Sequence, residues 1–331
     1  MMTKKTFSLT ASIINVFILI IIYTNSNSQE NNIKYYSNEN GTLGLMYHRF
    51  DENKYPSTNI KMSIFKKHIE IINKEGYEFE NPNLFDKNFQ KPKNKKKILL
   101  TIDDGFTSFY KNAWPYLKEK QIPFILFVST EAVGNSGYMS WEELKEIEKY
   151  DFAFLGNHSH SHDYLLDFSF KNFKEDINTS IKLFKKNFGY NPIFFSYPFG
   201  EYSEKQIDFI KTKFKYAFGQ HSGVIDLNKN QYELPRFPIN EKYGDLERFS
   251  FLINLLPLQY KKVTPNDKYV TENNPPRLII EFFPEQKNLD KVNCFSDEGN
   301  NWEKTNIQLI DKKLIVKFRE KFSFRRGRIN C

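Results

Sequence analysis

Short apolar segments that alternate with helical segments constrain the fold of this chain more than any other feature. Between residues 41 and 256, runs of strand length are followed by stretches with apolar residues at helical spacing. Repeated βα units of this kind predict a parallel sheet, either open or closed into a barrel. The expected strands lie at residues 44–48, 97–102, 124–128, 152–155, 193–197 and 216–218.

Capping residues mark several of the expected helices. Ser140 with Glu143, and Ser203 with Gln206, match the capping box, in which two side chains bond to free N–H groups of the first helical turn. Pro115 lies inside another amphipathic stretch and predicts a kink or a break there, because proline lacks an N–H group.

The first residues have the layout of a targeting segment. Lys4 and Lys5 precede an apolar run that is continuous from Val16 to Tyr23, and the chain then turns polar. This pattern is typical of a secretory signal, but no Ala-x-Ala cleavage site follows it, so an uncleaved membrane anchor is the alternative. We expect residues 1–30 to direct export, to the periplasm, the extracellular space or the outer face of a membrane.

The pattern changes again after residue 256. Residues 261–276 are polar and flanked by prolines, as a linker would be, and residues 277–331 contain strand-like runs without a helical pattern. We therefore expect a large domain over residues 40–256 and a small all-β module, such as a sandwich, over residues 277–331. Cys294 and Cys331 both lie in this module; in an exported protein they predict a disulfide, with two unpaired thiols as the alternative.

The formal net charge of +8 comes mostly from scattered lysines. The densest basic run, residues 91–97, contains no aromatic residue. It predicts a solvated loop, or less favourably a contact with an anionic glycan or a membrane surface, and nucleic-acid binding is not indicated.

Two adjacent carboxylates stand where a buried strand ends. The apolar run at residues 97–102 stops at Asp103 and Asp104, which Gly105 follows. Neighbouring carboxylates raise each other's pKa unless a cation or a proton resolves the conflict, so the pair suits metal-assisted acid–base chemistry. The alternative is a solvated Asp-Asp-Gly turn.

Three of the six histidines lie within residues 158–162. His158 and His162, four residues apart, can present their imidazoles to one ion. A carboxylate from another strand would complete a set that leaves coordination positions open for water and substrate. His160 would then point elsewhere, and a polar loop without a metal is the alternative.

Three segments resemble the polysaccharide deacetylases, the NodB-homology domain of carbohydrate esterase family 4. They are Thr-Ile-Asp-Asp-Gly at residues 101–105, His-Ser-His-Ser-His at residues 158–162 and Phe-Ser-Tyr-Pro-Phe-Gly at residues 195–200. The resemblance covers residues 40–250 and implies a distorted (β/α) barrel. It also implies a divalent metal, usually Zn²⁺, that serves to remove acetyl groups from N-acetylated sugars.

The resemblance implies a role for each motif residue. Asp104, His158 and His162 would hold the metal, and Asp103 would act as general base. The backbone N–H of Phe199 would stabilise the oxyanion, which a backbone donor can do whatever the side chain.

Two departures from the usual family pattern point to a subgroup. The third motif usually carries an arginine, where this chain has Ser196, and no histidine follows residue 250 to act as general acid. Both features match the deacetylases of poly-N-acetylglucosamine, whose general acid lies in an early Tyr-His segment, which implies this role for His48. Arg236 is the candidate to orient Asp103. The alternative for Arg236 is a surface arginine without a role in the site, and the alternative for His48 is an ordinary buried histidine.

The sequence therefore predicts a metal-dependent hydrolase that removes N-acetyl groups from an N-acetylhexosamine polysaccharide, either poly-N-acetylglucosamine or a chitin-like glycan. A non-catalytic glycan-binding protein on the same fold and an O-acetyl esterase are the alternatives. Four aromatic residues are candidates to stack on sugar rings: Trp141, Tyr197, Phe199 and Tyr202.

Overall fold

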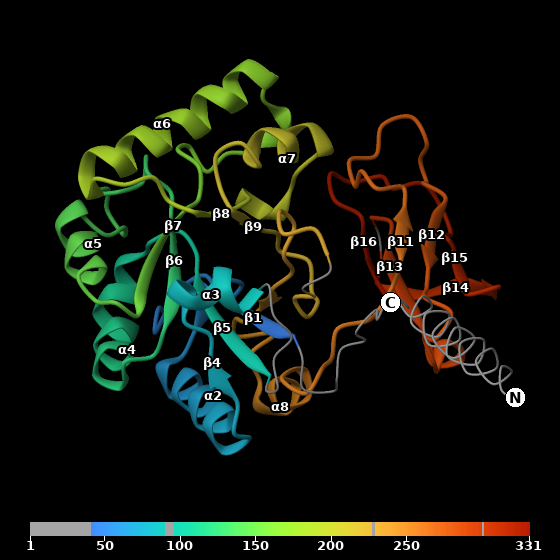
Figure 1. Ribbon diagram of the computed structural model, residues 1–331, viewed down its shortest axis with the longest axis horizontal. Helices are drawn as coiled ribbons and strands as arrows, with labels where there is room; N and C mark the ends of the chain where they lie inside the picture. The colour runs from blue at the N-terminus through green and yellow to red at the C-terminus, as the bar shows by residue number, and fades with distance from the viewer. Residues whose placement is uncertain (1–40, 90–95, 227–228, 300) are drawn as a thin grey trace, which may run out of the picture. The chain divides into compact units, whose positions relative to one another are not determined.

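The computed structural model describes residues 41–331, except 90–95, 227–228 and 300 (Figure 1). The expected leader at residues 1–30 and most of the basic run lie outside the described residues. Lys96, at the end of that run, is buried and donates hydrogen bonds to the carbonyl oxygens of Ile253 and Leu255, so the expected solvated loop is wrong for this residue. Among the described residues, no helix has the length and apolar character needed to cross a membrane.

An eight-stranded parallel sheet forms the centre of the large domain. Its strands follow the order β10-β1-β5-β6-β7-β8-β9, with β4 beside β5. A parallel bridge between Phe218 and Leu234 connects β9 to the segment that leads into β10, which curls the sheet into a distorted barrel. The predicted fold class is confirmed. The strands are β1 (Thr42–Tyr47), β4 (Glu78–Phe79), β5 (Lys97–Ile102), β6 (Phe124–Val128), β7 (Ala153–Asn157), β8 (Phe194–Ser196), β9 (Tyr216–Phe218) and β10 (Phe237–Pro238).

Helices accompany the strands of this sheet (Figure 1). Both predicted capping boxes are present, at Ser140 with Glu143 and at Ser203 with Gln206. The predicted break at Pro115 is also present, because a π-helical turn at Phe109–Ala113 precedes a helix in whose first turn Pro115 lies. The α-helices are α2 (Met62–Lys74), α3 (Pro82–Phe89), α4 (Trp114–Lys120), α5 (Trp141–Glu148), α6 (Phe170–Phe188), α7 (Glu204–Ile210) and α8 (Leu246–Leu252), and a short parallel pair is formed by β2 (Arg49–Phe50) and β3 (Asn59–Ile60).

The strand sequences are apolar on both faces because both faces of the sheet are covered. In β5, Ile98 and Leu100 belong to one apolar cluster together with residues of α2 and α4, whereas Leu99 belongs to another together with Ile125 and Phe127 of β6. Successive side chains of a strand point to opposite faces, so a continuous apolar run is needed where both faces are buried. The sheet therefore positions its strand ends rigidly.

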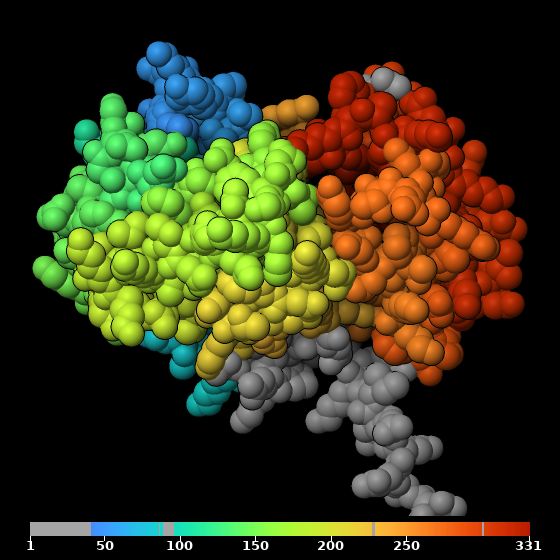
Figure 2. All heavy atoms as spheres, turned by 90° about the horizontal axis from the view of Figure 1, so that it is seen from above, coloured from blue at the N-terminus to red at the C-terminus, as the bar shows by residue number. Residues whose placement is uncertain are grey.

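The C-terminal residues form one six-stranded antiparallel sheet, in the order β11-β12-β15-β14-β13-β16. The all-β module is confirmed, but it is a single sheet and not the two packed sheets of a sandwich. Its first strand, β11, lies inside the segment that was expected to be a linker. Figure 2 shows the atoms of this module in orange to red. Its strands are β11 (Lys262–Thr264), β12 (Leu278–Glu281), β13 (Cys294–Asp297), β14 (Glu303–Ile310), β15 (Lys313–Lys317) and β16 (Arg328–Asn330).

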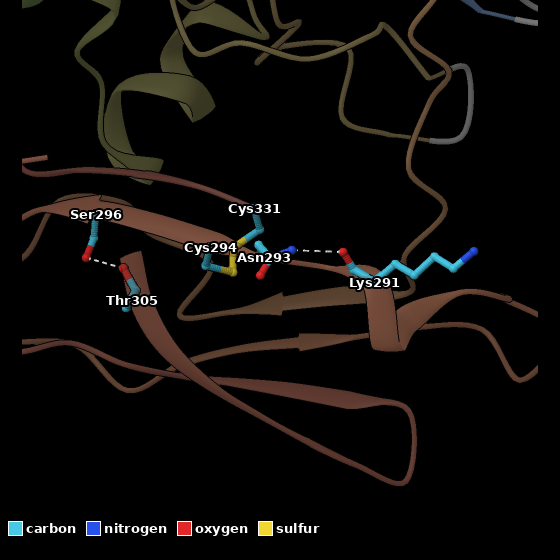
Figure 3. The surroundings of a disulfide bond; sticks show 6 residues. All are labelled: Lys291, Asn293, Cys294, Ser296, Thr305 and Cys331. Carbon is cyan, nitrogen blue, oxygen red and sulfur yellow. Dashed lines mark hydrogen bonds between the residues drawn. A yellow bond between two sulfur atoms is a disulfide. The ribbon is translucent and has the colours of Figure 1, made fainter. Parts of the chain in front are cut away.

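Cys294 and Cys331 form the predicted disulfide (Figure 3). It connects the first residue of β13 to the residue that follows β16, and these two strands also pair with each other. Beside it, the hydroxyl groups of Ser296 and Thr305 are hydrogen-bonded between β13 and β14. The barrel and the module belong to one compact unit, and the domain limits at residues 40–256 and 277–331 stay predictions.

Candidate active site

The chemically distinctive side chains lie where parallel strands end. Asp103 and Asp104 follow β5, His158 follows β7, and His48 follows β1. A short 3₁₀ turn, η3 (Pro198–Gly200), follows β8 and contains Phe199. Because the strands are parallel, their carboxyl ends meet at one edge of the sheet, as the βα pattern requires.

Asp104, His158 and His162 converge, with one nitrogen or oxygen atom of each within 4.8 Å of the others. Asp104 Oδ1 lies 3.3 Å from His158 Nε2 and 3.1 Å from His162 Nε2. Neither Asp104 Oδ1 nor His158 Nε2 has a hydrogen-bond partner within the described part of the chain, although both atoms are buried. A cation between them would satisfy both atoms, and two imidazoles with one carboxylate are a donor set that suits a divalent metal.

A backbone hydrogen bond fixes the orientation of the His158 ring. Its Nδ1 lies 2.7 Å from the carbonyl oxygen of Ser196, which can only accept, so Nδ1 carries the hydrogen. Nε2, the other ring nitrogen, lies on the side of Asp104, where a cation could bind to it. Ser196 thereby orients a metal-ligand candidate through its backbone, whatever its side chain.

A buried carboxylate holds the loop that carries both histidines. Asp176 of α6 accepts hydrogen bonds from the backbone N–H groups of His160 (2.8 Å) and Ser161 (2.9 Å). The loop needs this support because Ser159 and His162 have positive φ angles of 67° and 55°, which are unfavourable for residues with a side chain. Sequence reasoning missed Asp176, although a carboxylate on the buried face of an amphipathic helix was a usable signal.

Arg236 forms a bidentate ion pair with Asp103. Nη1 donates to Asp103 Oδ1 at 2.6 Å and Nη2 to Oδ2 at 2.9 Å, and both side chains are 0% exposed. The alternative of a surface arginine is therefore wrong. Nη2 also donates to the Ser196 hydroxyl at 2.8 Å, so the small side chain at the usual arginine position leaves room for this guanidinium.

The ion pair determines the charge of Asp103. Burial raises the pKa of its carboxyl group, but the Arg236 guanidinium together with the neighbouring His158 and His48 imidazoles more than offsets burial and holds that pKa below its ordinary value. The Asp104 carboxyl behaves similarly: burial opposes ionisation, yet contacts with His158 and His162 hold its pKa well below the usual range. Both groups are therefore carboxylates at neutral pH.

His48 lies within the field of these carboxylates. Burial lowers the pKa of its imidazole, and the charges of Asp104 and Asp103 offset only part of this effect. The residue is therefore electrostatically coupled to the same site, as its position at the end of β1 suggested.

Phe199 adopts an uncommon backbone conformation beside the ligand candidates. Its φ angle is 58°, and its ring packs edge-on against His162 with centroids 4.9 Å apart. Within the described residues, no protein group accepts a hydrogen bond from the Phe199 N–H. This N–H is therefore available to a ligand.

The expected role in sugar stacking is wrong for Tyr197 and Tyr202. Tyr197 and Tyr202 are buried and pack against each other in the apolar core, and Trp141 packs against Phe188. Phe199 contacts the ligand candidates through the ring of His162. Aromatic residues are so abundant in this chain that their type alone did not distinguish core from surface.

Comparison with known proteins gives concordant results. The family model for polysaccharide deacetylases matches residues 90–216. The poly-beta-1,6-N-acetyl-D-glucosamine N-deacetylase of Staphylococcus aureus is 26% identical over 232 residues, which cover 61% of this chain and 80% of the relative.

Solved structures share the fold at lower identity. The deacetylase PplD of Streptococcus pyogenes in complex with acetate has a TM-score of 0.58 at 21% identity, and covers 65% of this chain and 99% of its own. IcaB from Ammonifex degensii also has a TM-score of 0.58, at 22% identity, and covers 65% and 98%. At identities below 25%, both comparisons show a shared fold.

Proposed function

We propose, from the premise that this chain belongs to the polysaccharide deacetylase family, that it hydrolyses the N-acetyl groups of an N-acetylhexosamine polysaccharide. One observation carries the proposal: the Asp104, His158 and His162 set lies beside a second carboxylate, Asp103, which Arg236 keeps ionised. A polar loop or a solvated turn would not bury such groups together, because unpaired buried charges are strongly unfavourable.

The metal would be held by Asp104, His158 and His162, and Zn²⁺ is the most suitable ion for two imidazoles and one carboxylate. When bound, such an ion polarises the acetamide carbonyl and lowers the pKa of a water molecule. The hydrogen bond from His158 Nδ1 to the Ser196 carbonyl fixes the tautomer that this binding needs.

Asp103 acts as the general base in this proposal. Its Oδ2 lies 3.8 Å from His158 Nε2, so the carboxylate adjoins the ligand set. It accepts a proton from the water that attacks the acetamide carbon. Arg236 fixes the orientation of the carboxylate by its two parallel hydrogen bonds.

His48 and Phe199 complete the proton and charge balance. In its protonated form, the His48 imidazole gives its proton to the leaving amine. The Phe199 N–H donates a hydrogen bond to the oxyanion that develops on the carbonyl oxygen. Acetate and a free amino sugar are the products.

Poly-N-acetylglucosamine or a chitin-like glycan is the proposed substrate. The Staphylococcus aureus relative, which is named for the β-1,6-linked polymer, and the early Tyr47-His48 pair support this choice. We further propose that the protein acts outside the cytoplasm, released or anchored by its N-terminal segment. The leader-like pattern of residues 1–30 and the Cys294–Cys331 disulfide support this location.

The Asp103→Asn variant tests the mechanism. The variant is expected to retain its metal, because Asp104, His158 and His162 are unchanged, but to lose acetate release by at least about 100-fold, the lower end of what a general base contributes. Acetate would be measured with N-acetylglucosamine oligomers of β-1,4 and β-1,6 linkage, with and without a chelator, and metal content by mass spectrometry.

Asp208→Asn is the matched control, since Asp208 is an exposed carboxylate on α7. Full turnover by Asp103→Asn would exclude Asp103 as the base. Acetate release only from O-acetylated substrates would reassign the protein as an esterase. Glycan binding without any acetate release from wild type would make it a binding protein.

A further inference from the structure

A stack of rings leads from the candidate metal ligands to the C-terminal module. The His162 ring contacts the Phe199 ring, and Phe199 stacks on Tyr164 with centroids 4.2 Å apart and planes inclined by 21°. The guanidinium of Arg325, which belongs to the module, lies 4.0 Å from the Tyr164 ring centroid. A distant segment of the chain thus contacts Tyr164, whose ring stacks on Phe199 beside the ligand candidates.

Arg325 and its neighbour Arg326 also hold the backbone around η3. Arg326 Nη1 donates to the Phe199 carbonyl oxygen at 2.9 Å. Arg325 binds Glu201 through Nε and Nη2, at 3.0 and 2.7 Å from Oε2, and binds both oxygens of Asp167 through Nη1, at 2.9 and 2.8 Å. The two arginines therefore bracket the turn that contains Phe199.

The turn η3, which the two arginines contact, contains a backbone conformation that its surroundings must stabilise. Phe199 is held at a φ angle of 58°, which a residue with a side chain keeps only when its surroundings impose it. The direction of its N–H depends on this backbone conformation. A donor for an oxyanion acts well only when it is already aimed at the developing charge, so small displacements of the turn would be costly for catalysis.

The two arginines are exposed, but the Glu201 side chain that both contact is only 7% exposed. Pairs between two exposed groups contribute about 0–1 kcal/mol to stability, so the pairs with Glu201 support the fold as well as the position of the turn. Their paired hydrogen bonds are strongly directional. The positions of Arg325 and Arg326 depend on the fold of the module, because β16 begins two residues later, at Arg328. The disulfide at Cys331 connects the end of β16 to β13.

We propose that Arg325 and Arg326 are positioning residues of the deacetylation site, through which the C-terminal module holds Phe199 and Tyr164 in their working arrangement. This inference rests on the proposed function. It gives a catalytic purpose to a module that supplies none of the reacting groups assigned above.

The test compares Arg326→Ala, Arg326→Lys and Arg325→Ala/Arg326→Ala with wild type in the full-length protein. We expect kcat to fall about 10- to 100-fold in the double variant, as for a small misplacement of a catalytic group, with KM changed by less than about twofold. Arg326→Lys, which keeps the charge and one donor direction, should recover part of kcat. Metal content should match wild type in all three variants.

Arg328→Ala is the control, since Arg328 is exposed in the same segment and its side chain forms no ion pair with any described residue. Hydrogen–deuterium exchange of residues 197–203 supplies a readout that does not depend on activity, and it should accelerate in the double variant only. Unchanged kcat with unchanged exchange would overturn the inference, and so would a rise in kcat, which would indicate that the arginines obstruct the site.

Different results would contradict the proposed function and the positioning role of the two arginines. If wild type releases no acetate from any substrate, the proposed function is wrong, and exchange alone decides whether the arginines hold the turn. If wild type is active and the double variant matches it in kcat and exchange, only the positioning role is wrong.

Discussion

At the scale of single residues, Asp103 and Arg236 form a buried ion pair whose two members depend on each other. Both side chains are fully buried, and hydrogen-bond acceptors from four residues surround the guanidinium: Asp103, Thr101, Ser196 and the carbonyl of Gly219. Attraction between two buried charges only roughly repays their desolvation, so the pair is better explained by its effect on Asp103 than by stability. It keeps a carboxylate ionised and aimed in an apolar interior.

Replacement of Arg236 by methionine should therefore be severe. It leaves the Asp103 charge buried without a partner, and we expect the free energy of unfolding to fall by about 3–5 kcal/mol. Asp103→Asn combined with Arg236→Met should recover part of this loss, because the unpaired charge is gone. Urea unfolding followed by tryptophan fluorescence measures both, with Arg328→Met as control. A loss below about 1 kcal/mol would mean that the pair behaves like an exposed one.

At the scale of elements, His68 connects α2, β1 and the start of α8. Its Nε2 lies 2.7 Å from the Gly244 carbonyl and its Nδ1 lies 3.1 Å from the Tyr47 hydroxyl, while its ring stacks on Phe249 of α8 at 3.9 Å. A carbonyl only accepts, so Nε2 carries the hydrogen and Nδ1 accepts one from Tyr47. These contacts suit a neutral imidazole and also fix the residue that precedes His48.

This arrangement predicts a pH-dependent stability. Burial lowers the pKa of His68 to about 4, despite the Gly244 carbonyl and the charge of Asp245, which raise it. Between pH 6.5, the ordinary value, and pH 4, the unfolded chain binds a proton at His68 that the folded chain does not. Stability from this residue is thus complete above pH 6.5 and falls, by up to about 3 kcal/mol, as the pH drops to 4.

The variant His68→Gln isolates this effect, because glutamine can make both hydrogen bonds but does not titrate. We expect the free energy of unfolding of wild type to fall more steeply than that of His68→Gln between pH 7 and pH 4.5. Above pH 7 the difference between the two proteins should be constant. Parallel curves over the whole range would show that His68 has the same pKa in the folded and in the unfolded chain.

At the scale of the whole molecule, a large barrel is combined with a module that has a small core of its own. The buried apolar residues in the core of the module are few: Phe282, Leu289, Cys294, Leu314 and Val316. Small cores provide little net stability, and a disulfide compensates by restricting the unfolded chain. The link between Cys294 and Cys331 encloses a sequence separation of 37 residues and so constrains most of the module.

Replacement of both cysteines by serine should destabilise the module by about 2–4 kcal/mol. Calorimetry is expected to show an early transition for the module in the variant, followed by unfolding of the barrel, whereas wild type keeps the module folded to higher temperature. If Arg325 and Arg326 position the site, kcat should fall at temperatures where the module has melted while metal content is retained. An unchanged first transition would mean that the sheet itself suffices.

The local sequence determined the elements and the ends from which the site is built. Apolar runs that stop at polar groups located β5 and its two aspartates, the four-residue spacing located His158 and His162, and the two capping boxes appeared as expected. These signals are readable because they act between neighbours along the chain, through backbone geometry and the periodicity of burial.

Only the tertiary structure decided which distant side chains meet. Arg236 reaches Asp103 across 133 residues, and Arg326 reaches Phe199 across 127. The positive φ angles of Asp104, Ser159, His162 and Phe199 likewise have no local signature, because they are imposed by surroundings such as Asp176. Such contacts follow from how whole elements pack. Packing depends on the entire core, whose residues come from many separate stretches of the sequence.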